Sequence, residues 1–249
     1  MVTAEYPRHT ASFVLQGNNS FVNGTDYDRI VKLENAGRWL IMLNLYITRH
    51  GETKWNTERR LQGWLNSPLT EKGVSQGIKL HQAVKMYGIH KIYSSPSERA
   101  LKTAISAKGN LDVEIELLDE LKEMNMGEWE GKTLDEISAD DPENFENYWI
   151  RPHLFVKNTG ENFDEMLERA KNALEKIIKE NSEGNILVVT HGVTLKALMS
   201  HFSPEGFIRF WTKPVVEQAS ISMIKVHSMD EGEIVLYGDT RHFDEVEMK

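Results

Sequence analysis

The sequence predicts a layered α/β fold built on a mostly parallel sheet. Short apolar runs alternate with segments of helical periodicity over most of the chain, the pattern typical of a parallel sheet covered by helices. Two of the apolar runs end alike, in Ile47-Thr48-Arg49-His50-Gly51 and Val189-Thr190-His191-Gly192. No repeat and no linker interrupts the chain after Met42, so we expect one domain over residues 42–249.

Each strand is predicted from a short apolar or β-branched run bounded by turn residues. We expect strands at residues 43–48, 91–94, 113–118 and 186–190, followed by two closing strands at 220–226 and 233–237. A turn over Met229-Asp230-Glu231-Gly232 joins the last two.

The helices are predicted from apolar spacing of three and four residues and from their capping residues. We expect helices at 70–87 with Thr70 as N-cap, at 97–108 closed by Gly109, at 163–180 ended by Gly184, and at 193–201. A broken helix over 134–148 should restart at Pro142. The first helix should bury an apolar set: Val74, Ile78, Leu80, Ala83, Val84 and Tyr87.

Composition excludes several classes of function. The 29 Lys and Arg residues against 38 Asp and Glu residues give a net charge of −9, so we expect neither a nucleic acid nor an anionic membrane as partner. The absence of cysteine excludes disulfides, thiolate metal sites and cysteine nucleophiles. No apolar run has the length of a membrane span and no signal peptide is visible, so we expect a cytoplasmic enzyme.

The first 41 residues differ from the rest of the chain. They hold four acidic and four basic residues, so the whole net charge of −9 lies downstream, and they show neither helical nor strand periodicity. We expect them to be a disordered or artefactual extension that contributes nothing to catalysis.

Two histidines and two arginines carry the predicted chemistry. His50 and His191 each follow an apolar strand, and ligands of open α/β sheets bind at the carboxyl ends of strands. Arg49 precedes His50, and Arg99 lies at the start of a predicted helix. The planar fork of an arginine suits a phosphate. Guanidinium charge would also keep a nucleophilic His50 neutral by lowering its pKa.

The motifs around these residues resemble the histidine phosphatase (phosphoglycerate-mutase-like) superfamily. The resemblance begins at Arg49-His50-Gly51-Glu52-Thr53 with Trp55-Asn56. It continues in order through six further segments: Gln62-Gly63-Trp64, Ser67-Pro68-Leu69-Thr70 with Gly73, Ser94-Ser95-Pro96 with Arg99, Leu121-Lys122-Glu123, Gly160-Glu161 and Thr190-His191-Gly192. It implies a three-layer α/β/α sandwich with a small helical lid over about residues 124–160.

The resemblance also implies roles for individual residues. His50 would be the nucleophile that forms a phosphohistidine, and Glu123 would protonate the leaving oxygen and then activate water. Arg49, Arg99 and His191 would surround the phosphoryl group, with further contacts from Asn56, Gln62, Gly63 and Gly192. Among the lid aromatics Trp129, Phe145, Tyr148, Trp149 and Phe155, we expect Trp149 and Phe155 to face the substrate.

Three further residues, Glu52, Glu161 and His242, lie in or near these motifs without a part in the predicted chemistry. We expect Glu52 to be a structural partner of an arginine rather than the acid, and Glu161 to support the site from outside it. His242 matches a frequent C-terminal pattern of the family, which leaves open whether it lies near the site.

Within the family, the chain most resembles bacterial broad-specificity phosphatases of the PhoE type. Only 28 residues separate Gly131 from Gly160, and the characteristic mutase stretch is absent. A phosphoglycerate mutase, an alpha-ribazole phosphatase and a fructose-2,6-bisphosphatase-like enzyme remain open.

Two other classes compete with a histidine phosphatase. One is a metal hydrolase with His50, His191 and Glu123 as ligands, although Arg49 and Arg99 would repel a cation. The other is a catalytically silent phosphate-binding interaction module. We expect a small phosphomonoester as substrate and neither metal nor organic cofactor. A homodimer is the candidate assembly, and the sequence does not determine the oligomeric state.

Overall fold

The computed structural model describes residues 42–156, 159–212 and 214–243. The expected extension at residues 1–41 lies outside them. Within the described residues, no helix is long and apolar enough to cross a bilayer.

A six-stranded sheet forms the centre of the domain, in the order β3-β2-β4-β1-β5-β6. The strands are β1 (Met42–Arg49), β2 (Lys91–Ser94), β3 (Glu114–Leu117), β4 (Glu183–Thr190), β5 (Ile221–Ser228) and β6 (Glu231–Asp239). β1, β2, β3 and β4 pair in parallel, whereas β5 is antiparallel to both of its neighbours. The structure therefore confirms the mostly parallel sheet and the closing hairpin.

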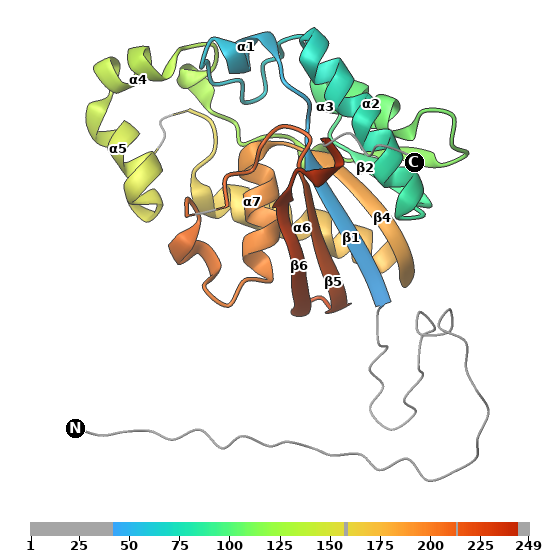
Figure 1. The fold of residues 1–249 in the computed structure, drawn as a ribbon. Helices are drawn as coiled ribbons and strands as arrows, with labels where there is room; N and C mark the ends of the chain where they lie inside the picture. Colours follow the sequence, from blue (N-terminus) through green and yellow to red (C-terminus); the bar gives the residue numbers. More distant parts are fainter. Residues whose placement is uncertain (1–41, 157–158, 213, 244–249) are drawn as a thin grey trace, which may run out of the picture.

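Helices cover both faces of the sheet, which gives the expected three layers (Figure 1). α2 (Glu71–Met86) and α3 (Glu98–Lys108) lie on one face, and α6 (Phe163–Glu180) and α7 (Gly192–His201) lie on the other. Side chains of β4 alternate between the layers: Ile186 and Val188 join the core with α6 and α7, whereas Leu187 and Val189 join the core with α2 and α3. This alternation is the period of two expected of a strand buried on both faces.

Three short helices complete the domain. They are α1 (Lys54–Thr57), α4 (Leu134–Asp140) and α5 (Pro142–Ile150). Figure 1 shows α1 at the carboxyl end of β1, with α4 and α5 to one side of it. Pro142 starts α5 as predicted, and the aromatic side chains of this region pack on the core of α6 and α7.

Two details of the helix predictions are wrong. Val74 and Ile78 are exposed, and α2 instead buries Gly73, Gln76 and Gly77 with Leu80, Ala83 and Val84. The reason is close packing: a Cβ on Gly77 would lie 2.8 Å from the Cβ of Ser106 on α3. α6 ends at Glu180 with Asn181 as its cap, so Gly184 belongs to β4 and does not terminate the helix.

Two glycines let the segment after β1 lie directly on the start of α2. A Cβ on Gly73 would collide with the carbonyl oxygen of Glu52 and lie 2.8 Å from its backbone nitrogen. A Cβ on Gly51 would collide with the carbonyl oxygen of Gly73. Backbone thus contacts backbone here, and Thr70 caps α2 by accepting from the amide of Gly73 at 3.0 Å. This backbone contact between residues 51–52 and Gly73 fixes the position of the chain directly after His50.

We predict that Gly73→Ala destabilises the domain, because backbone atoms of Glu52 occupy the space of the new methyl group. The free energy of unfolding should fall by about 1–3 kcal/mol, as for other overpacked sites, in a urea titration. The control is Val74→Ala, whose side chain is exposed on the same turn and which should change it by no more than about 0.5 kcal/mol. Equal stability of Gly73→Ala and the unmodified chain would contradict the close backbone approach.

Candidate active site

Parallel pairing brings the two predicted histidines together. Arg49 pairs with Thr190 at the ends of β1 and β4, and the amide of His50 donates to the carbonyl of Thr190 at 2.9 Å. The rings of His50 and His191 meet edge to face with their centroids 5.2 Å apart. Two residues 141 positions apart in the chain therefore line one site.

The hydrogen bonds of His50 fix which of its ring nitrogens is free. Nδ1 lies 2.7 Å from the carbonyl oxygen of Gly51. A carbonyl only accepts, so Nδ1 carries the proton and Nε2 keeps its lone pair when the ring is neutral. Burial lowers the pKa of His50 well below its usual value, and the charges of Arg99 and Arg49 lower it further. The ring is therefore neutral at neutral pH.

His191 is held from the neighbouring strand ends. Its Nε2 lies 2.8 Å from the hydroxyl oxygen of Ser95, which follows β2. Burial lowers the pKa of His191 well below its usual value, with further contributions from Arg99, His50 and Arg49. An anion bound beside His191 would raise that pKa again, so this ring can become charged when a phosphate arrives.

The guanidinium groups of Arg49 and Arg99 are both buried and both oriented by backbone carbonyls. Arg99 donates to the carbonyls of Gly63 and Leu65, each at 2.8 Å, and Arg49 donates to that of Val216 at 3.1 Å. Burial lowers the pKa of Arg99 to about 10, which leaves it charged at neutral pH. The sequence placed Arg99 at a helix start, and the structure places its side chain in the site.

Polar atoms without a partner gather at this site. Within the described residues, seven buried side-chain nitrogen or oxygen atoms lack a hydrogen-bond partner, and four belong to predicted site residues: Nε of Arg49, Oε1 of Gln62, Nε of Arg99 and Nδ1 of His191. Buried polar groups are normally paired. An anion in the site would accept hydrogen bonds from both guanidinium groups.

Glu123 faces the same site from the segment after residues 119–121, and its carboxylate lies at the first amides of α7. Its carboxylate accepts from the amides of Val193 and Thr194, each at 3.2 Å, and from that of Met124 at 2.9 Å. The positive end of the helix dipole therefore points at the carboxylate. A Cβ on Gly192 would lie 3.6 Å from Nε of Arg49 and 3.8 Å from Oε2 of Glu123, so Gly192 lies between these two groups.

A salt bridge outside the site supports Glu123. Glu161 and Arg169 pair at 2.6 Å, and Arg169 also donates to the carbonyls of Glu120, Lys122 and Glu123 at 2.8 to 3.1 Å. Glu161 thus holds the turn that carries Glu123, as expected of a residue outside the site. Glu52 instead accepts from Thr70 and Lys72, so the expected arginine partner is wrong and a lysine takes its place.

Most of the predicted residues line two adjoining cavities, whereas His191 is fully buried behind His50 and lines neither. The smaller, of about 80 Å³, is lined by Arg49, His50, Asn56, Gln62, Gly63, Arg99 and Glu123, and also by Arg60, Leu61, Met126, Tyr148 and Val193. Asn56 caps α1 through its Oδ1, which accepts from the amide of Thr53 at 3.1 Å. Its Nδ2 is therefore the end that can donate to a ligand.

The larger cavity, of about 340 Å³, extends from the first between aromatic rings. Arg49, Leu61, Glu123, Tyr148 and Val193 line both cavities. The remaining wall of the larger one is mostly apolar: Trp149, Gly192, Lys196, Trp211, Pro214, Val215 and Val216. A substrate with its phosphoryl group in the small cavity would place the rest of its structure here.

Trp149 lines this larger cavity, but the structure does not bring Phe155 to it. Phe155 is 3% exposed, and its ring packs against Trp129, Tyr148 and Phe163, so the expectation that it faces the substrate is corrected. His242 also lines neither cavity; it packs near Lys79 of α2. The wall residues Arg60, Lys196 and Trp211 were not predicted, because only the tertiary fold brings their segments to the site.

Comparison with known proteins agrees with this geometry. The sequence model of the histidine phosphatase superfamily (branch 1) matches residues 45–240. The chain belongs to this superfamily. It is 40% identical to the solved structure of YhfR from Bacillus stearothermophilus, with a TM-score of 0.77 over 81% of this chain and 100% of that one.

Curated relatives in this superfamily carry both phosphatase and mutase names. Phosphoserine phosphatase 1 of Hydrogenobacter thermophilus is 30% identical over 69% of this chain and 81% of its own length. A probable phosphoglycerate mutase, GpmB of Erwinia tasmaniensis, is 35% identical over 64% of this chain and 74% of its own. The predicted superfamily and fold are thus confirmed, whereas PhoE-type specificity stays a prediction.

We predict that the charge of Arg99 helps to keep His50 neutral. Arg99→Met should raise the pKa of His50 towards the ordinary value of about 6.5, because removing the cation favours the protonated ring. Arg99→Lys is the matched control, since it keeps the charge and should leave the pKa closer to that of the unmodified chain. Nitrogen-15 NMR titration of the ring distinguishes these outcomes. If the pKa of His50 rises equally in both variants, the low pKa depends on the packing of the Arg99 side chain rather than on its charge.

Proposed function

We propose that this chain is a metal-independent phosphomonoester hydrolase that works through a phosphohistidine on His50. One observation carries the proposal: a buried, neutral His50 with a free Nε2 shares a small cavity with two guanidinium groups and the carboxylate of Glu123. Such a cavity suits a phosphate dianion, because positive charge in a desolvated site stabilises the phosphoryl group most strongly.

The first step transfers the phosphoryl group to the enzyme. Nε2 of His50 attacks phosphorus, the bond from phosphorus to the leaving oxygen breaks, and Glu123 gives that oxygen a proton. Arg49, Arg99 and His191 stabilise the equatorial oxygens, and Asn56 and Arg60 add donors at the cavity wall. Since alkoxides are poor leaving groups, the proton from Glu123 is the contribution that such substrates need most.

The second step returns the enzyme to its starting state. The carboxylate of Glu123 takes a proton from water, the hydroxide attacks phosphorus, and the bond to Nε2 of His50 breaks to release inorganic phosphate. Glu123 is then protonated and His50 neutral, as at the start. The amides of α7 that bind the carboxylate stabilise the charged form that exists between the two steps.

A metal-dependent mechanism would require His50, His191 and Glu123 to converge on one cation. In the part of the chain that the structure describes, no three histidine or carboxylate side chains are grouped to hold a metal ion. Nδ1 of His50 and Nε2 of His191 instead contact Gly51 and Ser95, and both arginines would repel the ion.

Phosphoglycerate mutase is the second candidate, favoured by the identity to GpmB. Both reactions begin with the same phosphohistidine. A mutase must shield that intermediate from water and retain the product while it reorients. The short segment between Gly131 and Gly160 supports the hydrolase. Aromatic walls around the larger cavity support broad specificity, since apolar contacts discriminate weakly.

We predict that hydrolysis outpaces mutase activity. The experiment supplies 3-phosphoglycerate with a trace of 2,3-bisphosphoglycerate and follows 2-phosphoglycerate and free phosphate together, in EDTA. Free phosphate should appear faster, because water reaches the phosphohistidine. His50→Ala, which lacks the nucleophile, is the control and should form neither product. If 2-phosphoglycerate appears first, the chain is a mutase.

We predict that the effect of Glu123→Gln depends on the leaving group. The amide keeps an acceptor for the α7 amides but cannot donate a carboxyl proton. Turnover of phenyl phosphate should fall by about 100- to 10,000-fold, as for other general acids. Turnover of p-nitrophenyl phosphate should fall much less, because its leaving group needs little protonation. Steady-state kinetics on the two substrates makes the comparison, and equal losses would mean that Glu123 has a structural role.

A further inference from the structure

Lys196 is a buried cation that the proposed mechanism does not use. It lies on α7 with a side chain that is 8% exposed. Its Nζ donates to the carbonyls of Thr212 and Pro214 at 3.1 and 3.3 Å and lies 5.7 Å from the centroid of the Tyr237 ring. Among the described residues, no carboxylate forms an ion pair with it.

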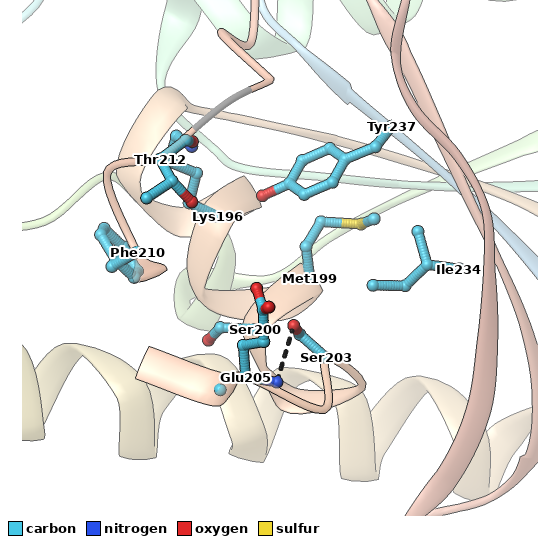
Figure 2. Close-up of a pocket in the computed structure, with 10 residues that line it drawn as sticks. Lys196, Met199, Ser200, Ser203, Glu205, Phe210, Thr212, Ile234 and Tyr237 are labelled. Carbon is cyan, nitrogen blue, oxygen red and sulfur yellow. Dashed lines mark hydrogen bonds between the residues drawn. The ribbon is translucent and has the colours of Figure 1, made fainter. Parts of the chain in front are cut away.

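Lys196 separates two cavities. It lines the cavity of about 340 Å³ that adjoins the phosphate site. It also lines a cavity of about 160 Å³ between α7, β6 and the segment that contains Thr212. Figure 2 shows this second cavity, with Lys196 beside Thr212 and the hydroxyl group of Tyr237 directed towards the same region. No other residue lines both cavities among those described.

An ammonium group in this place is costly unless something pairs with it. Two carbonyls replace only part of its hydration, and one of its three hydrogens has no acceptor among the described residues. Burial lowers the pKa of Lys196, the expected sign of that cost. The neighbouring positions of α7, Leu195, Ala197 and Leu198, are buried and apolar, so a leucine or methionine at position 196 would avoid the cost.

Charged side chains are few in the wall of the larger cavity, and Arg49 and Glu123 both lie where it adjoins the phosphate site. Glu123 lies at the end shared with the phosphate site, whereas Lys196 is the cation among its remaining described walls. Trp149, Trp211 and Val215 provide apolar surface in between. An anionic group on the part of a substrate that occupies this cavity would therefore be attracted to Lys196, since Arg49 is already opposed by Glu123. In a desolvated pocket such a charge-assisted hydrogen bond is strong.

We infer that Lys196 is a specificity-determining residue that selects phosphomonoesters with a carboxylate on the part that occupies the larger cavity. This inference rests on the proposed function and narrows its substrates to phosphomonoesters that also carry a carboxylate. The third hydrogen of the ammonium group would donate to the carboxylate, and the aromatic walls would contact the connecting part of the substrate.

A purely structural role makes a different prediction. The carbonyls bound by Lys196 belong to the segment whose Val216 carbonyl accepts from Arg49. If Lys196 only held this segment, its loss would slow every substrate alike. A matched pair of substrates that differ in charge but hardly in shape therefore separates the two roles.

The experiment compares 4-carboxyphenyl phosphate with 4-carbamoylphenyl phosphate, and repeats the comparison with the 3-substituted isomers. The unmodified chain should show a kcat/KM at least about tenfold higher for a carboxylate than for its amide, as expected for a hydrogen bond to a charged group. Leaving-group chemistry works against this preference, because the neutral amide withdraws electrons more strongly. Lys196→Met should reduce the ratio to about one, whereas Lys196→Arg should retain a preference.

Controls separate the inference from the proposed function. Lys171→Met, which changes a half-exposed lysine on α6, should leave the ratio unchanged. Should Lys196→Met fail to fold, Lys196→Gln makes the same comparison, since its amide can still donate to the two carbonyls. The inference is overturned if the unmodified chain shows no carboxylate preference with either isomer, or if the preference survives loss of the charge. Absence of phenyl phosphate turnover would instead refute the proposed function.

Discussion

The arrangement of the site depends on keeping two guanidinium groups buried at the carboxyl edge of a parallel sheet. Arg49 and Arg99 lose most of their hydration there, and backbone carbonyls and the nearby carboxylate of Glu123 replace only part of it. Burial and their charge together keep His50 neutral, and their donors are directed at the place where a phosphoryl group would bind. The loop carbonyls of Gly63 and Leu65 are shaped around Arg99, so the same charge also organises the cavity wall.

Glu123 shows how a carboxylate can work beside this positive charge. The start of α7 binds it through backbone amides, and Arg169 fixes the preceding turn through three carbonyls. Thr190 and Thr194 add hydrogen bonds to the carbonyls of Leu121 and Lys122, each at 2.7 Å. β4, α6 and α7 therefore position one side chain together. Preorganisation of this kind lets the carboxylate exchange protons without moving.

The site thus divides into a polar part suited to a phosphoryl group and a mostly apolar part that could hold the rest of a substrate. The small cavity is lined by residues from segments that bear the family motifs. The larger cavity is lined mainly by α5, α7 and residues 211 and 214–216. Lys196 interrupts its apolar wall with one charge. A relative that kept the small cavity and changed the walls of the larger one would carry out the same chemical steps on a different substrate. The relatives of this chain do carry both phosphatase and mutase names.

The sequence alone determined the elements and the polar centre. Alternating apolar runs fixed the sheet strands and helices closely, because periodicity records which faces are buried. The motifs identified His50, Arg49, Arg99, Glu123 and His191, which lie beside strand ends or helix starts where local order predicts the position of a side chain.

Tertiary structure decided the rest. Gly77 packs α2 against α3 and so turns Val74 and Ile78 outward, and an aromatic cluster draws Phe155 inward. Arg60, Lys196 and Trp211 reach the site only when separate segments pack together, and no local pattern in a sequence encodes such contacts.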